Sequence, residues 1–187
     1  GNINAGTVSA ADDVTLTASA ANGSILNSNS TVTGDLITLT SGANGSIGAS
    51  GDKVQTVASS HNVTAGTGGV FLDERNDLTL TGTNITAASG AAFDVSSEQS
   101  LAITGDISQG SGAITLTSDS DNSNPGEPFN SAFDTLTQAD GTVIGGAGQS
   151  GQITLTSRGD MQLETITTSG DLNIISEVGT LTHTSST

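Results

Sequence analysis

A short glycine turn recurs in this chain at a fixed interval. Asn22-Gly23-Ser24-Ile25 returns as Asn44-Gly45-Ser46-Ile47, and Gly1-Asn2-Ile3 precedes the first of them by the same 22 residues. A period of roughly 20 to 50 residues is typical of a solenoid, in which each coil buries its apolar face only against its neighbours. We therefore expect a repeat protein and not a domain that closes around a single core.

Between the turns lies a second recurring string, in which Thr alternates with Val, Ile or Leu. It occupies residues 14–17, 37–40, 78–81, 114–117 and 153–156. Alternation with a period of two predicts β-strands with the apolar residues inside and Thr outside. The period also predicts that Asn22 stacks on Asn44 and that Phe71 stacks on Phe93. Residues 1–187 are thus expected to form one β-solenoid of about eight coils.

Composition agrees with a narrow solenoid and excludes several partners. Aromatic residues make up only 2 %, and 33 % of residues are hydrophobic, which suits an interior built from small and branched side chains. The net charge of −16, with three basic residues, disfavours nucleic acid and anionic lipid. No apolar run is long enough to cross a membrane, so direct membrane insertion is not expected. We expect the chain to be a segment of a longer protein.

One coil is expected to carry an insertion at about residues 118–140. The distance from Gly105-Asp106-Ile107 to Gly141-Thr142-Val143 is 36 residues, one period plus 14 more. The segment contains both prolines of the chain and two of its four phenylalanines, Phe129 and Phe133. Long loops on rigid scaffolds often carry function, so the loop and its phenylalanines are predicted to be a contact site.

The same loop contains a candidate calcium site. Asp119, Asp121 and Ser123 have the alternate spacing that the oxygen ligands of a calcium loop use. The pattern departs from the helix-flanked calcium loop at Asn124, where Gly is expected, and at Asn130, where a bidentate Glu is expected. The alternative is an acidic loop in solvent. No cofactor is expected to be required, and calcium is the one candidate.

Arg158-Gly159-Asp160 is a tripeptide that integrin-type receptors recognise on displayed loops, so Arg158 and Asp160 are candidate binding residues. Gly-Asp followed by an apolar residue also occurs at residues 34–36, 105–107 and 170–172. The Gly-Asp part is therefore also explained as the turn that leads into a strand of the repeat.

Other patterns point away from catalysis. The chain has no Cys, its two histidines His61 and His183 are far apart, and no Gly-x-Ser-x-Gly motif is present. We predict that the protein is not an enzyme. The acidic and basic residues of 73–77 are expected to form exposed ion pairs on a corner loop. Outward Thr rows resemble those of ice-binding solenoids, which leaves that function as an alternative.

Gly-Asp-apolar strands, Asn-Gly corners and an acidic Thr/Ser/Gly-rich composition without Cys resemble the repeat region of filamentous haemagglutinin-like exoproteins. The resemblance covers nearly the whole chain outside residues 118–140. It implies a right-handed parallel β-helix that is secreted to the surface of a Gram-negative cell, like an autotransporter passenger, and is associated with the outer membrane.

The resemblance implies a stalk or passenger segment of an adhesin, whose partner is a receptor or a glycan on a host or neighbouring cell. A second reading is a self-assembling filament, sheath or surface-layer protein, because the ends of a solenoid expose unpaired backbone that can template end-to-end association. A third is a carbohydrate-binding or ice-binding solenoid.

Overall fold

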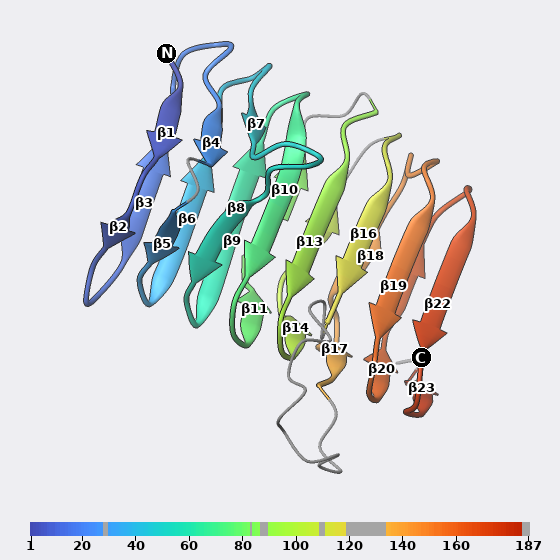
Figure 1. Ribbon diagram of the computed structural model, residues 1–187. Helices are drawn as coiled ribbons and strands as arrows, with labels where there is room; N and C mark the ends of the chain where they lie inside the picture. Colours follow the sequence, from blue (N-terminus) through green and yellow to red (C-terminus); the bar gives the residue numbers. More distant parts are fainter. Residues whose placement is uncertain (28–29, 83, 87–89, 109–110, 119–133, 185–187) are drawn as a thin grey trace.

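The protein is a parallel β-solenoid. The computed structural model describes residues 1–27, 30–82, 84–86, 90–108, 111–118 and 134–184. These residues contain no helix, and their strands stack into about seven turns, as Figure 1 shows. Each turn contributes three strands, and β22 with β23 begins an eighth coil, in agreement with the number expected from the period.

The strands belong to two parallel sheets that face each other across the core. The first sheet contains β1 (Ile3–Ala5), β2 (Val8–Ser9), β4 (Ile25–Asn27), β5 (Thr31–Thr33), β7 (Ser46–Ile47), β8 (Val54–Val57), β10 (Gly69–Glu74), β13 (Phe93–Ser97), β16 (Ile114–Thr117), β19 (Ile153–Ser157) and β22 (Leu172–Ser176). The second sheet contains β3 (Val14–Thr17), β6 (Leu36–Thr40), β9 (Ser60–Ala65), β11 (Leu78–Leu80), β12 (Asn84–Thr86), β14 (Leu101–Ile103), β15 (Ile107–Ser108), β17 (Leu136–Gln138), β18 (Val143–Gly145), β20 (Met161–Leu163), β21 (Thr165–Thr167) and β23 (Leu181–His183).

Ladders of apolar side chains fill the interior, as the alternating strings predicted. One ladder crosses eight strands of the first sheet through Ile3, Ile25, Ile47, Val70, Phe93, Ile114, Ile153 and Leu172. The six residues from Ile25 to Ile153 are fully buried. Because parallel strands in register place like residues about 4.8 Å apart, each side chain is covered by the same kind of side chain above and below.

The cross-section of the solenoid changes between the third and fourth coils. In coils one to three the first sheet has two columns of short strands, β1-β4-β7 and β2-β5-β8, and both columns end on the single long strand β10. The second sheet does the opposite, because the long strand β9 pairs with both β11 and β12. We call this place the step. The repeat alone did not predict it.

The predicted stacking of Phe71 on Phe93 is wrong. Register places Val70 opposite Phe93, whereas Phe71 lies opposite Asp94. Phe93 is fully buried, and Phe71 is half-buried on the outer face. The spacing at this point is 23 residues and not 22, and a shift of one residue moves a side chain to the other face of a strand.

The turns are held together by polar ladders. Asn44 Nδ2 donates to Asn22 Oδ1 at 2.9 Å, which confirms the predicted stack. Aspartates at the corners make a second kind of link, because Asp106 accepts a hydrogen bond from the Val143 backbone N–H of the next coil at 2.9 Å. Asp77 accepts one from Ser100 N–H in the same way at 3.1 Å. Corner carboxylates thus satisfy backbone donors that no strand reaches.

The predicted insertion does not extend to residue 140. Strand β16 ends at Thr117, and residues 119–133 lie outside the described residues. Residues 136–138, which the sequence placed inside the loop, form strand β17. The reason is packing, since Leu136 is fully buried between Leu101 and Met161 in the ladder of the second sheet.

Outward Thr rows form, but they are short and lie on different sheets. Thr15 and Thr17 of β3 pair with Thr38 and Thr40 of β6 in the second sheet. The row from β16 to β19 lies on the first sheet, where Thr115 pairs with Thr154. The exchange of long and short strands at the step separates the two rows.

Glycine is required where two corners touch, which gives a test of the stacking. A Cβ on Gly105 would overlap the backbone of Gly82 in the preceding coil, whereas a Cβ on Gly51 would meet nothing within 4 Å. We expect Gly105→Ala to lower the free energy of unfolding by about 1–3 kcal/mol, because backbone cannot move aside. Gly51→Ala is the matched control and should change it by less than about 0.5 kcal/mol. Urea denaturation of both variants measures this, and equal stabilities would contradict the corner packing.

Candidate functional site

The step creates a projecting bulge on the outer face of the first sheet. Strand β10 runs from Val70 to Glu74 in five residues. The preceding coil takes ten residues from Ile47 to Thr56, the strand partners of those two. The excess cannot lie flat against β10, so residues 48–53 leave the sheet, with Gly48 at φ 70° and an antiparallel bridge between Ala49 and Asp52.

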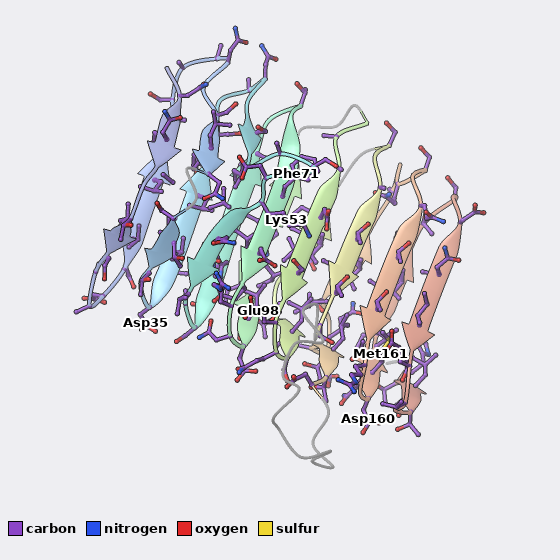
Figure 2. All side chains as sticks on the ribbon, in the orientation of Figure 1. Asp35, Lys53, Phe71, Glu98, Asp160 and Met161 are labelled. Carbon is purple, nitrogen blue, oxygen red and sulfur yellow. The ribbon has the colours of Figure 1, made fainter. Side chains whose placement is uncertain are left out.

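A polar groove lies beside this bulge, with a volume of about 670 Å³. Figure 2 shows Lys53 and Glu98 on the strands and loops around it. Four carboxylates and one ammonium contribute to the lining, so the groove is acidic. The lining residues are Asn27, Ser50, Gly51, Asp52, Lys53, Gln55, Asp73, Asp94, Ser96, Glu98 and Thr117.

Hydrogen bonds hold the bulge over the neighbouring strands. Lys53 reaches from the end of the bulge across β10 to β13, where its Nζ lies 2.8 Å from Asp94 Oδ1 and donates to Ser96 Oγ at 3.1 Å. The Ser96 hydroxyl in turn donates to Asp73 Oδ1 at 2.7 Å. Behind the bulge, Asn27 Nδ2 donates to Asp52 Oδ1 at 3.1 Å. The groove is therefore ordered by its own side chains.

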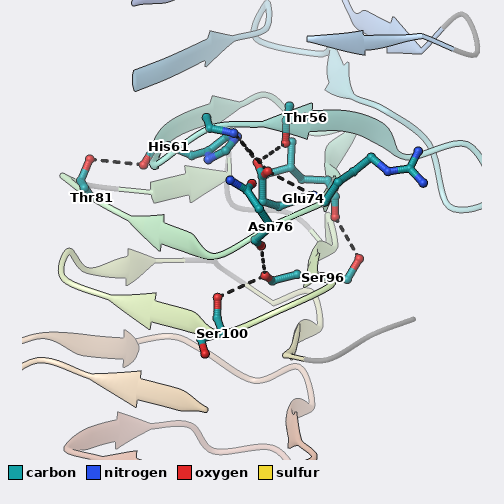
Figure 3. A network of polar contacts seen from close by, with 11 residues as sticks. Thr56, His61, Glu74, Asn76, Thr81, Ser96 and Ser100 are labelled. Atoms are coloured by element: carbon teal, nitrogen blue, oxygen red, sulfur yellow. Dashed lines mark hydrogen bonds and ion pairs between the residues drawn. The ribbon is translucent and has the colours of Figure 1, made fainter. Parts of the chain in front are cut away.

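In the core beneath the groove lies a buried histidine–carboxyl pair, formed by His61 of β9 and Glu74 of β10 and shown in Figure 3. Both side chains are fully buried, with His61 Nε2 3.2 Å from Glu74 Oε2. Glu74 accepts hydrogen bonds from the Thr56 hydroxyl at 2.7 Å and from the backbone N–H groups of Ala58 and Arg75, each at 3.1 Å. Neither ring nitrogen of His61 makes a well-aligned hydrogen bond to the described residues. A proton on Oε2 is the donor that would satisfy Nε2.

The expectation that residues 73–77 form exposed ion pairs on a loop is wrong for Glu74. Its side chain is the last inward position of β10 and lies beneath the step. Asp73 and Arg75 do face outward, and Arg75 Nε lies 3.3 Å from Glu98 Oε1. Alternation along the strand puts neighbouring charged residues on opposite faces.

Burial shifts the pKa values of the pair in opposite directions. Loss of solvation raises the pKa of Glu74 to about 7, although hydrogen bonds from Thr56, Ala58, Arg75 and Asn76 oppose the shift. Loss of solvation lowers the pKa of His61 to about 3. Both shifts favour uncharged forms, as expected for groups in a low-dielectric core. At mildly acidic pH the pair therefore holds one proton, on Glu74.

On the second sheet, the buried side-chain amide of Asn84 bonds backbone groups that the step leaves without a strand partner. Strand β9 pairs with β11 at His61 and with β12 from Thr64 onward, so the backbone between these two points has no strand partner on this side, although it pairs with β6 on the other. Asn84 Oδ1 accepts the hydrogen bond of the Val63 N–H at 3.1 Å, and its Nδ2 donates to the Thr81 carbonyl at 2.9 Å. The side chain of Asn84 thus replaces one rung of the ladder.

Among the residues that the structure describes, none of the site residues predicted from the sequence lines the groove. Asp119, Asp121, Ser123, Phe129 and Phe133 lie outside the described residues. Within the described ranges, no group of three His, Asp or Glu side chains is arranged to hold a metal ion. The calcium site therefore stays a prediction.

Arg158-Gly159-Asp160 lies in the turn between β19 and β20 and is part of the stack. Gly159 is buried, and Asp160 Oδ1 accepts hydrogen bonds from both the N–H and the hydroxyl of Thr180 in the next coil, each at 2.7 Å. These bonds lower the pKa of the Asp160 carboxyl. Asp160 thus does the same work as the corner carboxylates of Asp77 and Asp106.

The sequence contains a signal for the buried pair. In Val54-Gln55-Thr56-Val57 the two valines are three residues apart, so they cannot share a face of a strand. Val54 and Thr56 are the fully buried residues of β8, and Val57 is only half-buried. A polar residue at an inward position indicates a polar partner inside, and here that partner is Glu74.

Comparison with known family models, curated proteins and solved structures finds no match for this chain. The described residues also include no helix long and apolar enough to cross a membrane.

The buried pair predicts an unusual pH dependence of stability. In the unfolded chain the ordinary pKa values of 4.5 for Glu74 and 6.5 for His61 apply. From pH 5.5 to 8.5 the unfolded state loses its His proton near 6.5 and the native state loses its Glu proton near 7. Each state of the pair loses one proton in this range, so the two losses nearly cancel, and the free energy of unfolding should change by less than about 1 kcal/mol as pH rises.

Glu74→Gln should remove this compensation. The amide keeps the shape of the protonated carboxyl, and only His61 of the pair then titrates, with a proton bound in the unfolded state below pH 6.5 and none in the native state. Stability should rise by about 1.4 kcal/mol from pH 5.5 to 8.5. Urea denaturation at both pH values measures the change. Glu177→Gln, at an exposed position, is the control and should keep the parent trend; the same trend in Glu74→Gln would contradict the one-proton pair.

Proposed function

We propose that this chain is a non-enzymatic stalk or passenger segment of a secreted cell-surface adhesin. The observation that supports the proposal is the unbroken interior ladder from Ile3 to Leu172, which makes the chain a rod. The rod has seven strand spacings between β1 and β22, or about 34 Å. A rod of this kind holds an attachment site away from the surface that carries it.

The outer surface suits an exposed role. The net charge of −16 keeps separate rods apart and soluble, and it disfavours nucleic acid as a partner. The side faces carry Thr, Asn and Asp, which can contact a polar ligand while the apolar ladders inside and the polar ladders at the corners maintain the fold. The proposed partner is a receptor or a glycan on a host or neighbouring cell, reached after export to the surface of a Gram-negative bacterium.

Attachment can be measured with beads that carry the purified chain. We expect such beads to attach to epithelial or bacterial cells more often than beads that carry an unrelated acidic protein of the same net charge. The matched control is the Gly105→Ala variant after thermal unfolding, because it has nearly the same composition as the parent chain but no longer has the rod-shaped fold. Attachment no greater than that of the acidic control would contradict the adhesive role.

A second function, self-assembly into a filament, sheath or layer, is favoured by the last described coil. Its large apolar side chains are exposed, at 44 % for Leu172, 46 % for Ile175, 59 % for Val178 and 52 % for Leu181. Leu172 and Leu181 continue interior ladders, so a further coil stacked on β22 and β23 would cover them. In this second function, the coil that covers them belongs to another copy of the chain.

Light scattering after size exclusion separates the two functions. Self-assembly predicts that mass rises with concentration and that Leu172→Ser with Leu181→Ser reduces the rise, because burial of these side chains drives association. Thr154→Ser, on a half-buried outward position, is the control. A constant monomer mass up to millimolar concentration would contradict self-assembly of this segment and would leave the stalk.

A further inference from the structure

Three carboxylates in the groove share one arrangement. In Asp52, Asp73 and Asp94, Oδ1 accepts a hydrogen bond from within the protein, from Asn27, Ser96 and Lys53 respectively. Among the described residues, Oδ2 of each carboxylate accepts none. The groove therefore presents three acceptors whose side chains are already held in place, and binding to them costs little ordering of side chains.

The groove also presents donors. Gln55 Oε1 accepts from Arg75 at 3.4 Å, which leaves the Gln55 amide N–H₂ for a ligand. The hydroxyls of Ser50 and Thr117 line the same space. A ligand that only donates, such as an ammonium group, would leave these donors unsatisfied. A hydroxyl both donates and accepts, so a ligand rich in hydroxyls satisfies both sets.

The charge, polarity and volume of the groove restrict the class of ligand further. Four carboxylates against one lysine repel phosphates, sulfates and uronic acids. The lining contains no large apolar side chain, so an apolar ligand would bury polar groups without partners. The volume of about 670 Å³ is within the usual range of ligand pockets, roughly 300–1,000 Å³.

The surface beyond the groove continues the same chemistry along the rod. Register aligns the outward residues Gln55, Asp73, Ser96, Thr117 and Thr156 in one row across β8, β10, β13, β16 and β19. Their spacing is that of the strands, about 4.8 Å. Ser96 in this row is only 5 % exposed, so a linear ligand that lies across the strands would meet the polar side chains of the other four.

We propose that the groove beside residues 48–53 binds a linear, neutral oligosaccharide. Carboxylate Oδ2 atoms of Asp52, Asp73 and Asp94 accept hydrogen bonds from sugar hydroxyls, and Gln55 and Thr117 donate to sugar oxygens. The inference rests on the proposed attachment role for its biological meaning, and it names the ligand class of that role.

The test is calorimetric titration of the whole chain with two sets of probes. The first set comprises neutral gluco-, manno- and galacto-oligosaccharides and N-acetylglucosamine oligomers. The second set comprises oligogalacturonate and heparin fragments. We expect millimolar or tighter binding of at least one neutral probe and none of the anionic probes.

Asp73→Asn and Asp94→Asn should each weaken that binding at least about tenfold. Asn keeps the Oδ1 acceptor for Ser96 or Lys53 and replaces the free Oδ2 acceptor by a donor, so the fold is retained and the ligand bond is lost. Asp35→Asn is the matched control, because Asp35 is exposed and lies away from the groove in Figure 2. Circular dichroism confirms that each variant is folded, and the control should bind like the parent.

Three outcomes would overturn the inference: no neutral probe binds at millimolar concentration, binding is unchanged by both groove substitutions, or the anionic probes bind and the neutral ones do not. Beads that attach to cells while no neutral probe binds would remove this inference and leave the adhesin proposal. Groove-dependent sugar binding without cell attachment would support this inference and contradict the adhesin proposal.

Discussion

In-register stacking of identical inward positions is the constraint on which this structure depends. No coil has a core of its own, and an inward residue such as Ile47 is buried only because Ile25 and Val70 lie on either side of it. The arrangement needs few aromatic residues, since opposite walls are close. It also makes corners that touch sensitive to size, as where Gly105 rests directly on Gly82.

The step is the place where this constraint is locally broken. Exchange of long and short strands between the two sheets leaves some backbone N–H groups without a partner strand. Buried polar side chains accept the hydrogen bonds of these groups instead. Glu74 accepts the Ala58 N–H on one side of the core, and Asn84 accepts the Val63 N–H on the other. Burial of a carboxyl carries a desolvation cost, and protonation of Glu74 beside His61 reduces that cost.

The same step has an outer consequence. A regular solenoid face is nearly flat and offers a ligand few walls, whereas the surplus residues of the third coil form a bulge beside the outward row of β10 and β13. Lys53 ties the bulge to Asp94 and Ser96. The irregularity that the core tolerates is thus also what makes a groove on the rod, and the stalk and binding roles are compatible in one segment.

The sequence by itself determined the solenoid, the period, the inward and outward residues of most strands and the Asn22–Asn44 stack, because these follow from local alternation and glycine turns. Only the tertiary structure decided the register at Phe71 and Phe93, the end of the insertion at β17, the role of Asp160 in the stack, and the position of Glu74 beside His61. Each of these depends on which residue of a neighbouring coil lies opposite. A one-residue change in coil length reverses the face of a side chain, and no pattern within a single coil records the length of the next.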